Sequence, residues 1–121
     1  MVSEPVRRFT RVNLASWRVR RVCRYIEANL EHRLDTEALA RVAYSSRAHF
    51  CRTFKRTFGV SVHQYVVQRR IERAQLLMLT TPATLTEIAA SCGMSDQSHL
   101  ARLFRRAVDE PPSAWRKRNV G

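Results

Sequence analysis

The sequence is poor in glycine, in acidic residues and in long apolar runs. Only three of its 121 residues are glycine, which argues against a glycine-rich phosphate-binding loop. Ten Asp and Glu stand against 22 Lys and Arg, so the formal net charge is +12 and an anionic partner is expected. Nucleic acid is the commonest such partner, and a membrane surface is the second option. No apolar run approaches the roughly 20 residues that span a bilayer, and no apolar segment follows the basic N-terminus to make a secretory signal. These features predict a cytoplasmic protein.

Cysteine and histidine are sparse and scattered. The three cysteines, Cys23, Cys51 and Cys92, are odd in number, and no two lie close enough for a metal knuckle. Buried or half-buried thiols in a reducing compartment are expected instead. The four histidines do not stand beside cysteines or carboxylates at a ligand spacing, and no nucleophile elbow or pair of carboxylates occurs. The sequence therefore predicts no metal, no cofactor and no catalytic residue.

Helical periodicity runs through nearly the whole chain, and strand-like alternation is nowhere sustained. One apolar face of a first helix consists of Val19, Val22, Cys23, Ile26 and Leu30. Asp35 and Ser46 are candidate N-caps for the next two helices, and Gly59 suits the left-handed position after the second. A long helix is expected over residues 61–80, opened by Ser61 and stopped by the proline in "TTPAT".

The second half of the chain repeats this pattern. A short helix begins at Leu85, Gly93 makes a turn, and Ser95 or Asp96 caps the next helix. "DEPP" breaks that helix, and a short last helix follows from Pro112. The sequence therefore predicts an all-α fold.

One segment occurs twice, as "SSRAHFCRTFKR" at residues 45–56 and as "SDQSHLARLFRR" at residues 95–106. Each copy follows a short helix and a turn, with one extra residue in the second turn, which is the helix-turn-helix plan. We expect four parts: a flexible arm over 1–13, a first helix-turn-helix subdomain over 14–60, a linker helix over 61–80 and a second subdomain over 81–121.

Helical geometry gives each copy an apolar back and a polar front. The backs are Phe50, Thr53, Phe54, Thr57 and Phe58 in the first copy, and Leu100, Leu103, Phe104, Ala107 and Val108 in the second. The fronts are Arg47, Ala48, Cys51, Arg52 and Lys55, and Gln97, Ser98, Ala101, Arg102 and Arg105.

The two fronts suit double-stranded DNA. Arginine can pair with guanine, and glutamine with adenine, through two hydrogen bonds each, while small residues let the backbone approach. The residues expected to read bases are Arg47, Ala48, Cys51, Arg52, Gln97, Ser98, Ala101 and Arg102. Those expected to hold phosphates are Ser46, Lys55, Arg56, Ser95, His99, Arg105 and Arg106. For His49 and His99, phosphate contact and a place at the edge of the core are both open.

The distance between the copies fits one turn of DNA. A helix of about 20 residues is about 30 Å long, close to the roughly 34 Å of one B-DNA turn. The long helix can therefore hold two reading helices in successive major grooves. Because the fronts differ, a monomer would read an asymmetric site.

The chain resembles the DNA-binding domain of the AraC/XylS family of bacterial transcription regulators. The matching segments are "LARVAYSSRAHFCRTFKRTFGVSVHQYVVQRRIERAQLLM" and "LTEIAASCGMSDQSHLARLFRR…PPSAWRKR", within residues 14–118. The resemblance implies about seven helices, two helix-turn-helix subdomains joined by a long central helix, base-reading helices at 46–57 and 96–107, and control of promoters. It further implies a nucleoid-associated activator that touches RNA polymerase. Asp109 stands where the family usually has glycine, and Asp tolerates the left-handed conformation.

Two alternatives remain open at this point. A basic helical module could bind nucleic acid or a membrane surface through charge alone, without sequence preference. Four aromatic residues could then be stacking platforms, but their positions on apolar stripes or at the borders of such stripes favour the core: Trp17, Tyr25, Tyr65 and Trp115. Family members often carry a ligand-sensing domain before this one, so the chain is either a stand-alone regulator or an excised domain.

Overall fold

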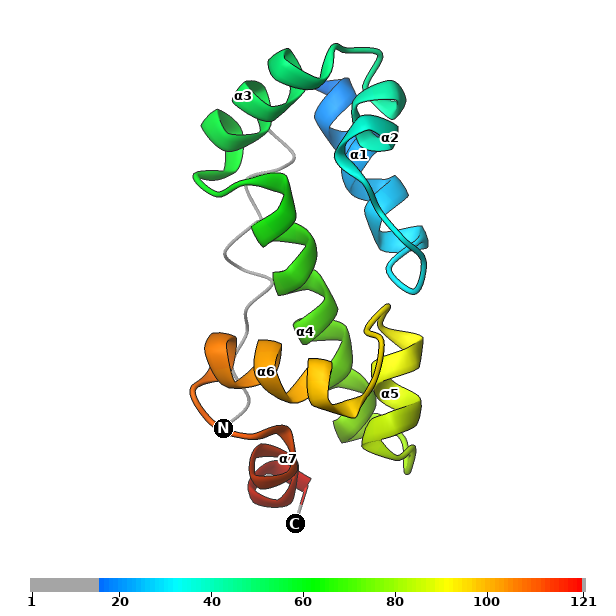
Figure 1. The fold of residues 1–121 in the computed structure, drawn as a ribbon, viewed down its shortest axis with the longest axis vertical. Helices are drawn as coiled ribbons and strands as arrows, with labels where there is room; N and C mark the ends of the chain where they lie inside the picture. The colour runs from blue at the N-terminus through cyan, green and yellow to red at the C-terminus, as the bar shows by residue number, and fades with distance from the viewer. Residues whose placement is uncertain (1–15, 121) are drawn as a thin grey trace.

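The computed structural model describes residues 16–120, which form seven α-helices and contain no β-strand. The helices are α1 (Trp17–Ala28), α2 (Thr36–Val42), α3 (Arg47–Phe58), α4 (Val62–Thr80), α5 (Leu85–Ser91), α6 (Gln97–Val108) and α7 (Pro112–Val120). The first three gather at one end of the long α4 and the last three at the other (Figure 1). We call these ends lobe one and lobe two. The predicted all-α fold with two helix-turn-helix units on a central helix is confirmed, whereas the arm expected over 1–13 lies outside the described residues.

The two helix-turn-helix units, α2–α3 and α5–α6, are copies of each other. Both α3 and α6 are 12 residues long, and their first residues, 47 and 97, are 50 positions apart. The first residues of α2 and α5, 36 and 85, are 49 positions apart. The additional residue therefore lies in the second turn, as the sequence predicted.

Polar side chains at the start of six helices explain where those helices begin. The N-caps of α1 to α6 are Ser16, Asp35, Ser46, Ser61, Thr84 and Asp96. Each accepts a hydrogen bond from a backbone N–H that the first turn leaves unpaired, which stabilises a helix by about 1 kcal/mol. Of the two residues predicted to cap α6, Asp96 is the cap, since its carboxylate accepts from the His99 N–H at 2.8 Å.

The ends of α3 and α6 are equivalent despite different residues. Gly59 follows α3 with φ of 77°, and Asp109 follows α6 with φ of 67°. Both are left-handed, and both backbone N–H groups donate to a carbonyl four residues earlier, at Lys55 and Arg105. The left-handed turn predicted at Asp109 is confirmed.

Each lobe has its own apolar core, and α4 contributes to both. In lobe one the Phe54 and Tyr65 rings meet edge to face with centroids 5.2 Å apart. In lobe two the Phe104 and Trp115 rings do the same at 5.7 Å. From α4, the core of lobe one takes Val62, Tyr65 and Val66, and the core of lobe two takes Ile71, Ala74 and Met78. One rigid helix therefore carries both packed units.

Two of the four aromatic residues predicted for the core are on the surface. Tyr65 and Trp115 are buried as predicted, but Trp17 is 53% exposed and Tyr25 is 39% exposed. Trp17 is the first residue of α1 and precedes Val19, the first buried residue of that helix. The Trp17 ring lies 6.1 Å from the ring of Tyr44, in the turn after α2.

The predicted apolar backs are narrower than expected. Thr57 and Ala107 occupy back positions by helical geometry, but both are exposed. They lie in the last turns of α3 and α6, at the border of the stripe. The Thr57 hydroxyl donates to the Thr53 carbonyl at 2.9 Å instead of packing.

Substitution of a central phenylalanine tests the two cores. Phe54→Ala and Phe104→Ala should each lower the free energy of unfolding by about 3–5 kcal/mol, because each leaves a cavity in a closed core. Urea unfolding followed by circular dichroism measures this. Leu76→Ala is the control, because Leu76 is 58% exposed on α4 and should change stability by less than about 1 kcal/mol. Equal losses for buried and exposed residues would contradict the packing described.

Candidate nucleic-acid interface

The front of α3 is basic and open to solvent. The exposed side chains are Ser46, Arg47, Ala48, Arg52, Lys55 and Arg56, and Cys51 is half-buried among them. Behind them Phe50 and Phe54 are buried. Since α3 contains no acidic residue, the positive end of its helix dipole adds to its side-chain charge.

The front of α6 has the same design with different residues. The exposed side chains are Ser95, Gln97, Ser98, Arg102, Arg105 and Arg106, while His99 and Ala101 are half-buried. Leu100 and Phe104 are fully buried behind them. Residues 51–65 and 101–115 match in burial class at every pair of positions 50 residues apart. Each helix therefore gathers its predicted base-reading and phosphate-holding residues on its outer side.

Thr86 of α5 orients Gln97, and the sequence did not indicate this role of Thr86. The Thr86 hydroxyl donates to Gln97 Oε1 at 3.2 Å. This leaves the Gln97 amide nitrogen with both donors and the oxygen with one lone pair, the set that a bidentate contact to adenine requires. The two residues are 11 positions apart, on different helices, so no local pattern could have indicated the contact.

The equivalent histidines have different partners. His99 Nδ1 accepts from the Ser95 backbone N–H at 3.1 Å, so the neutral ring carries its proton on Nε2. That proton is a donor with no part in the turn, which suits a phosphate oxygen. His49 is exposed and instead lies 3.5 Å from Thr53 Oγ1. The extra residue in the second turn brings the Ser95 backbone to His99 and accounts for the difference.

A polar cleft of about 490 Å³ opens beside Arg47 in lobe one. Its lining comes from the segment before α2, from α2 and from α3: Arg33, Leu34, Asp35, Thr36, Glu37, Arg41 and Arg47. Arg33 and Arg41 are exposed and were not predicted as site residues. Their position beside Arg47 extends the basic front of lobe one from α3 to α2.

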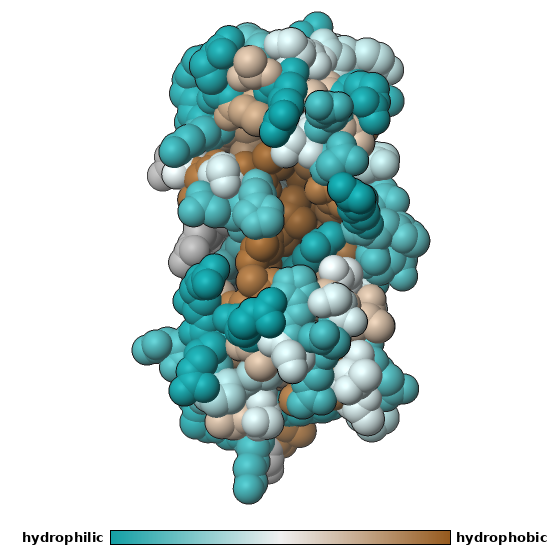
Figure 2. Space-filling model, viewed as in Figure 1, coloured by the Kyte–Doolittle hydropathy of each residue, from teal (hydrophilic) through white to brown (hydrophobic). Residues whose placement is uncertain are grey.

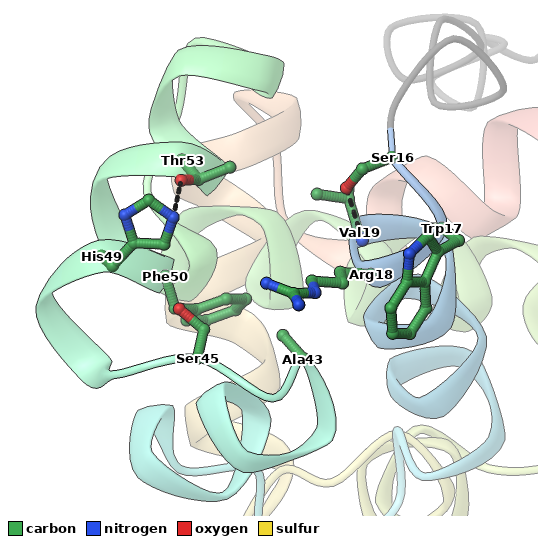
Figure 3. Close-up of a pocket in the computed structure, with 9 residues that line it drawn as sticks. All are labelled: Ser16, Trp17, Arg18, Val19, Ala43, Ser45, His49, Phe50 and Thr53. Atoms are coloured by element: carbon green, nitrogen blue, oxygen red, sulfur yellow. Dashed lines mark hydrogen bonds between the residues drawn. The ribbon is translucent and has the colours of Figure 1, made fainter.

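A second hollow, of about 300 Å³, separates the start of α1 from α3. Figure 3 shows Arg18 between the two helices, with His49 and Thr53 on the α3 side and Ser16 and Trp17 on the α1 side. Phe50 and Ala43 form part of its wall. The hollow borders the flank of α3 rather than its front.

Several arginines bond to the protein itself and are not part of the fronts. Arg116 of α7 donates to the Met78, Thr81 and Ala83 carbonyls at 3.2, 2.7 and 2.6 Å, which ties α7 to the end of α4. Arg69 donates to both oxygens of Glu27, at 2.9 Å for the Nη2 contact. The N–H donors that make these contacts are therefore not free to hydrogen-bond directly to an anionic partner.

The three cysteines are free thiols in two environments. Burial raises the pKa of the Cys23 thiol and raises the pKa of Cys92 to about 11. Cys51 is half-buried on the front of α3. This agrees with the predicted buried or half-buried thiols.

Within residues 16–120, no three His, Cys, Asp or Glu side chains are grouped so that they could hold a metal ion. No helix of the same part of the chain has the length and apolarity needed to cross a bilayer. Figure 2 shows polar side chains over both lobes and apolar atoms in the hollow between them.

Two helix-turn-helix units on one shared helix define a class of DNA-binding transcription regulators. Residues 39–118 match a family model described as a helix-turn-helix domain. The chain belongs to this family, which is of the AraC/XylS type.

Relatives and solved structures agree with this assignment. The chain is 32% identical over 91 residues to the probable transcriptional regulator LumQ of Photobacterium leiognathi, covering 75% of this chain and 37% of LumQ. The DNA-binding domain of the global transcriptional factor AdpA, solved with a target DNA, is 31% identical with a TM-score of 0.79, covering 86% of this chain and 93% of that one. A probable AraC family regulator from Rhodopseudomonas palustris is 33% identical with a TM-score of 0.74, covering 88% and 100%. The chain spans less than half the length of LumQ and of the other first-matched relatives.

Alkylation of thiols tests whether the α3 front contacts DNA. At pH 8 iodoacetamide should modify Cys51 first, because Cys92 is buried and its raised pKa keeps it protonated. A saturating duplex should slow modification of Cys51 and leave the slow rates at Cys23 and Cys92 unchanged. Peptide mass spectrometry gives the three rates. An unchanged Cys51 rate in the complex would place the α3 front away from DNA.

Proposed function

We propose that this chain is a sequence-specific regulator that binds double-stranded promoter DNA as a monomer and reads two successive major grooves of an asymmetric site. The observation that carries this proposal is the pair of equivalent helices, α3 and α6, at the two ends of α4. With 19 residues α4 is about 28 Å long, which approaches one turn of B-DNA.

The differences between the two fronts favour an asymmetric site. In lobe one the proposed base-reading residues with hydrogen-bonding capacity are Arg47 and Arg52, which suit guanine. In lobe two they are Gln97, Ser98 and Arg102, and Gln97 suits adenine. Cys51 and Ala101 occupy matching front positions and offer van der Waals contact rather than strong hydrogen bonds. Two unlike half-sites need only one protein molecule.

The phosphate contacts would come from the ends of the same helices. Ser46 and Ser95 lie just before α3 and α6, where backbone N–H groups and the helix dipole favour an anion. His99 offers its Nε2 proton, and the basic pairs Lys55–Arg56 and Arg105–Arg106 lie in the last turns. Neutralising several phosphates makes affinity fall steeply as salt concentration rises.

We further propose that the regulator is an activator that contacts RNA polymerase while bound in the nucleoid, in a binding role without catalysis. The support is the family assignment and the DNA complex of AdpA. The competing reading is a basic module that binds nucleic acid or a membrane surface through charge alone.

Selection from a random duplex pool separates these readings. The proposed function predicts an enriched motif in two unlike parts whose centres are about one turn, 10–10.5 base pairs, apart. Enrichment of no motif, with equal binding to all duplexes and to anionic vesicles, would favour the charge-only reading.

Two arginine substitutions test base reading directly. Arg52→Ala and Arg102→Ala should each weaken binding to the selected duplex by about 1–3 kcal/mol and relax the preference at one base position. Arg24→Ala is a control, because it removes the same charge from an exposed position on α1. Competition binding to single-base variants of the duplex measures the effect. If Arg52→Ala and Arg102→Ala weakened all duplexes equally, these residues would contact phosphates and not bases.

A further inference from the structure

Three segments meet at the junction of the two lobes. The Leu30 carbonyl, two residues beyond the end of α1, belongs to lobe one. Arg70 of α4 donates from Nε to this carbonyl at 3.1 Å and from Nη2 to the His32 carbonyl at 2.8 Å. Gly93, in the turn between α5 and α6, lies against the same group from lobe two. Figure 1 shows the loop after α1 and the turn before α6 approaching each other beside α4.

The contact leaves no room for a side chain on Gly93. A Cβ at this position would overlap the Leu30 carbonyl oxygen and come within 2.9 Å of Arg70 Cζ. The Leu30 oxygen is a backbone atom, so a change of side-chain rotamer cannot move it away. Partial burial lowers the pKa of Arg70 below its usual value, which agrees with a guanidinium that is half-buried between the two lobes.

The first helix-turn-helix unit is an internal control for this glycine. Tyr44 occupies the turn position equivalent to Gly93, and its φ of 54° is left-handed like the 78° of Gly93. Tyr44 N donates to the Arg41 carbonyl and Gly93 N to the Ala90 carbonyl, so both turns have the same hydrogen bond. Yet the Tyr44 side chain is 62% exposed. The turn conformation alone therefore accepts a large residue, and the close approach of the lobes is what requires glycine at 93.

We propose that Arg70 and Gly93 are positioning residues that fix the angle between α3 and α6, so that they set the half-site spacing the protein accepts. This rests on the proposed reading of two grooves. The turn that contains Gly93 leads directly into α6, while Leu30 packs in the core that carries α3. Rotation of one lobe about the α4 axis would either separate Gly93 from Leu30 or drive the two backbones together.

The DNA geometry turns this restraint into specificity. One added base pair moves the second half-site by about 3.4 Å and rotates it by about 35° about the duplex axis. Lobes held at a fixed angle cannot follow both changes. Insertion or deletion of one base pair between the half-sites should therefore weaken binding of the unsubstituted protein at least about tenfold, equivalent to about 1.4 kcal/mol.

Spacing variants of the duplex selected from a random pool test the proposal. Gly93→Ala and Arg70→Met should reduce the spacing penalty to less than about threefold, or about 0.7 kcal/mol. Gly59→Ala is a matched control, because Gly59 has φ of 77° and no atom within 4 Å of an added Cβ. Arg73→Met removes the same charge from α4 and is the control for Arg70. Both controls should keep the tenfold penalty.

Retention of the tenfold penalty in Gly93→Ala and Arg70→Met would overturn the proposal. So would loss of the penalty in all four variants alike. If Arg70 held a phosphate instead, Arg70→Met would weaken every spacing equally and keep the penalty.

A measurement without DNA separates this inference from the proposed function. Nitroxide labels on Cys51 and on an Ala107→Cys substitution report the distance between α3 and α6 by double electron–electron resonance. The distance distribution should be narrow in the unsubstituted background and in Gly59→Ala, and broad in Gly93→Ala and Arg70→Met. If no duplex were selected, the proposed function would fail, and the distance distributions alone would decide whether Arg70 and Gly93 fix the angle between the lobes. Equal widths in all variants would contradict this positioning role.

Discussion

The whole molecule depends on one helix that is packed from both ends. The first turns of α4 pack against lobe one, where the Tyr65 ring contacts the Phe54 ring. The last turns of α4 complete the core around Phe104 and Trp115. A packed interior tolerates little displacement, so each lobe is fixed to its own stretch of the same rigid rod. The separation of α3 from α6 is thus a consequence of core packing along α4. In the proposed function, this separation corresponds to the turn of DNA between two half-sites.

Two groups of arginines have different physical roles. Those on the fronts of α3 and α6 keep their donors in solvent, where an anion can take them. Arg69, Arg70 and Arg116 direct theirs at carboxylate or carbonyl oxygens between helices that are distant in sequence. Such groups stabilise the arrangement of the helices because a guanidinium forks to several acceptors at once. The distinction limits which charges can contribute to salt-dependent binding of DNA.

Local chemistry made most of the fold predictable from the sequence. Caps such as Asp35 and Ser61, the left-handed Asp109 and the apolar backs at Phe54 and Phe104 all follow from rules that act within one or two turns. The repeat then predicted which side of α3 and α6 is open. Contacts between distant segments left no such pattern: Thr86 with Gln97, and the carbonyls held by Arg70 and Arg116, depend on tertiary packing. Trp17 was misplaced because it precedes Val19, the first buried residue of α1, and a position at the border of an apolar stripe does not decide whether a side chain is covered. The base and phosphate roles of the front residues remain predictions.

The central claim is that one chain spans two unlike half-sites through α3 and α6. Hydroxyl-radical footprinting of the selected duplex, with the stoichiometry of the same complex measured by analytical ultracentrifugation, tests it most directly. The account predicts one chain per duplex, with protection on one side of the DNA centred on two sites about 10–10.5 base pairs apart. Two chains on a symmetric footprint, or protection confined to a single groove, would contradict it.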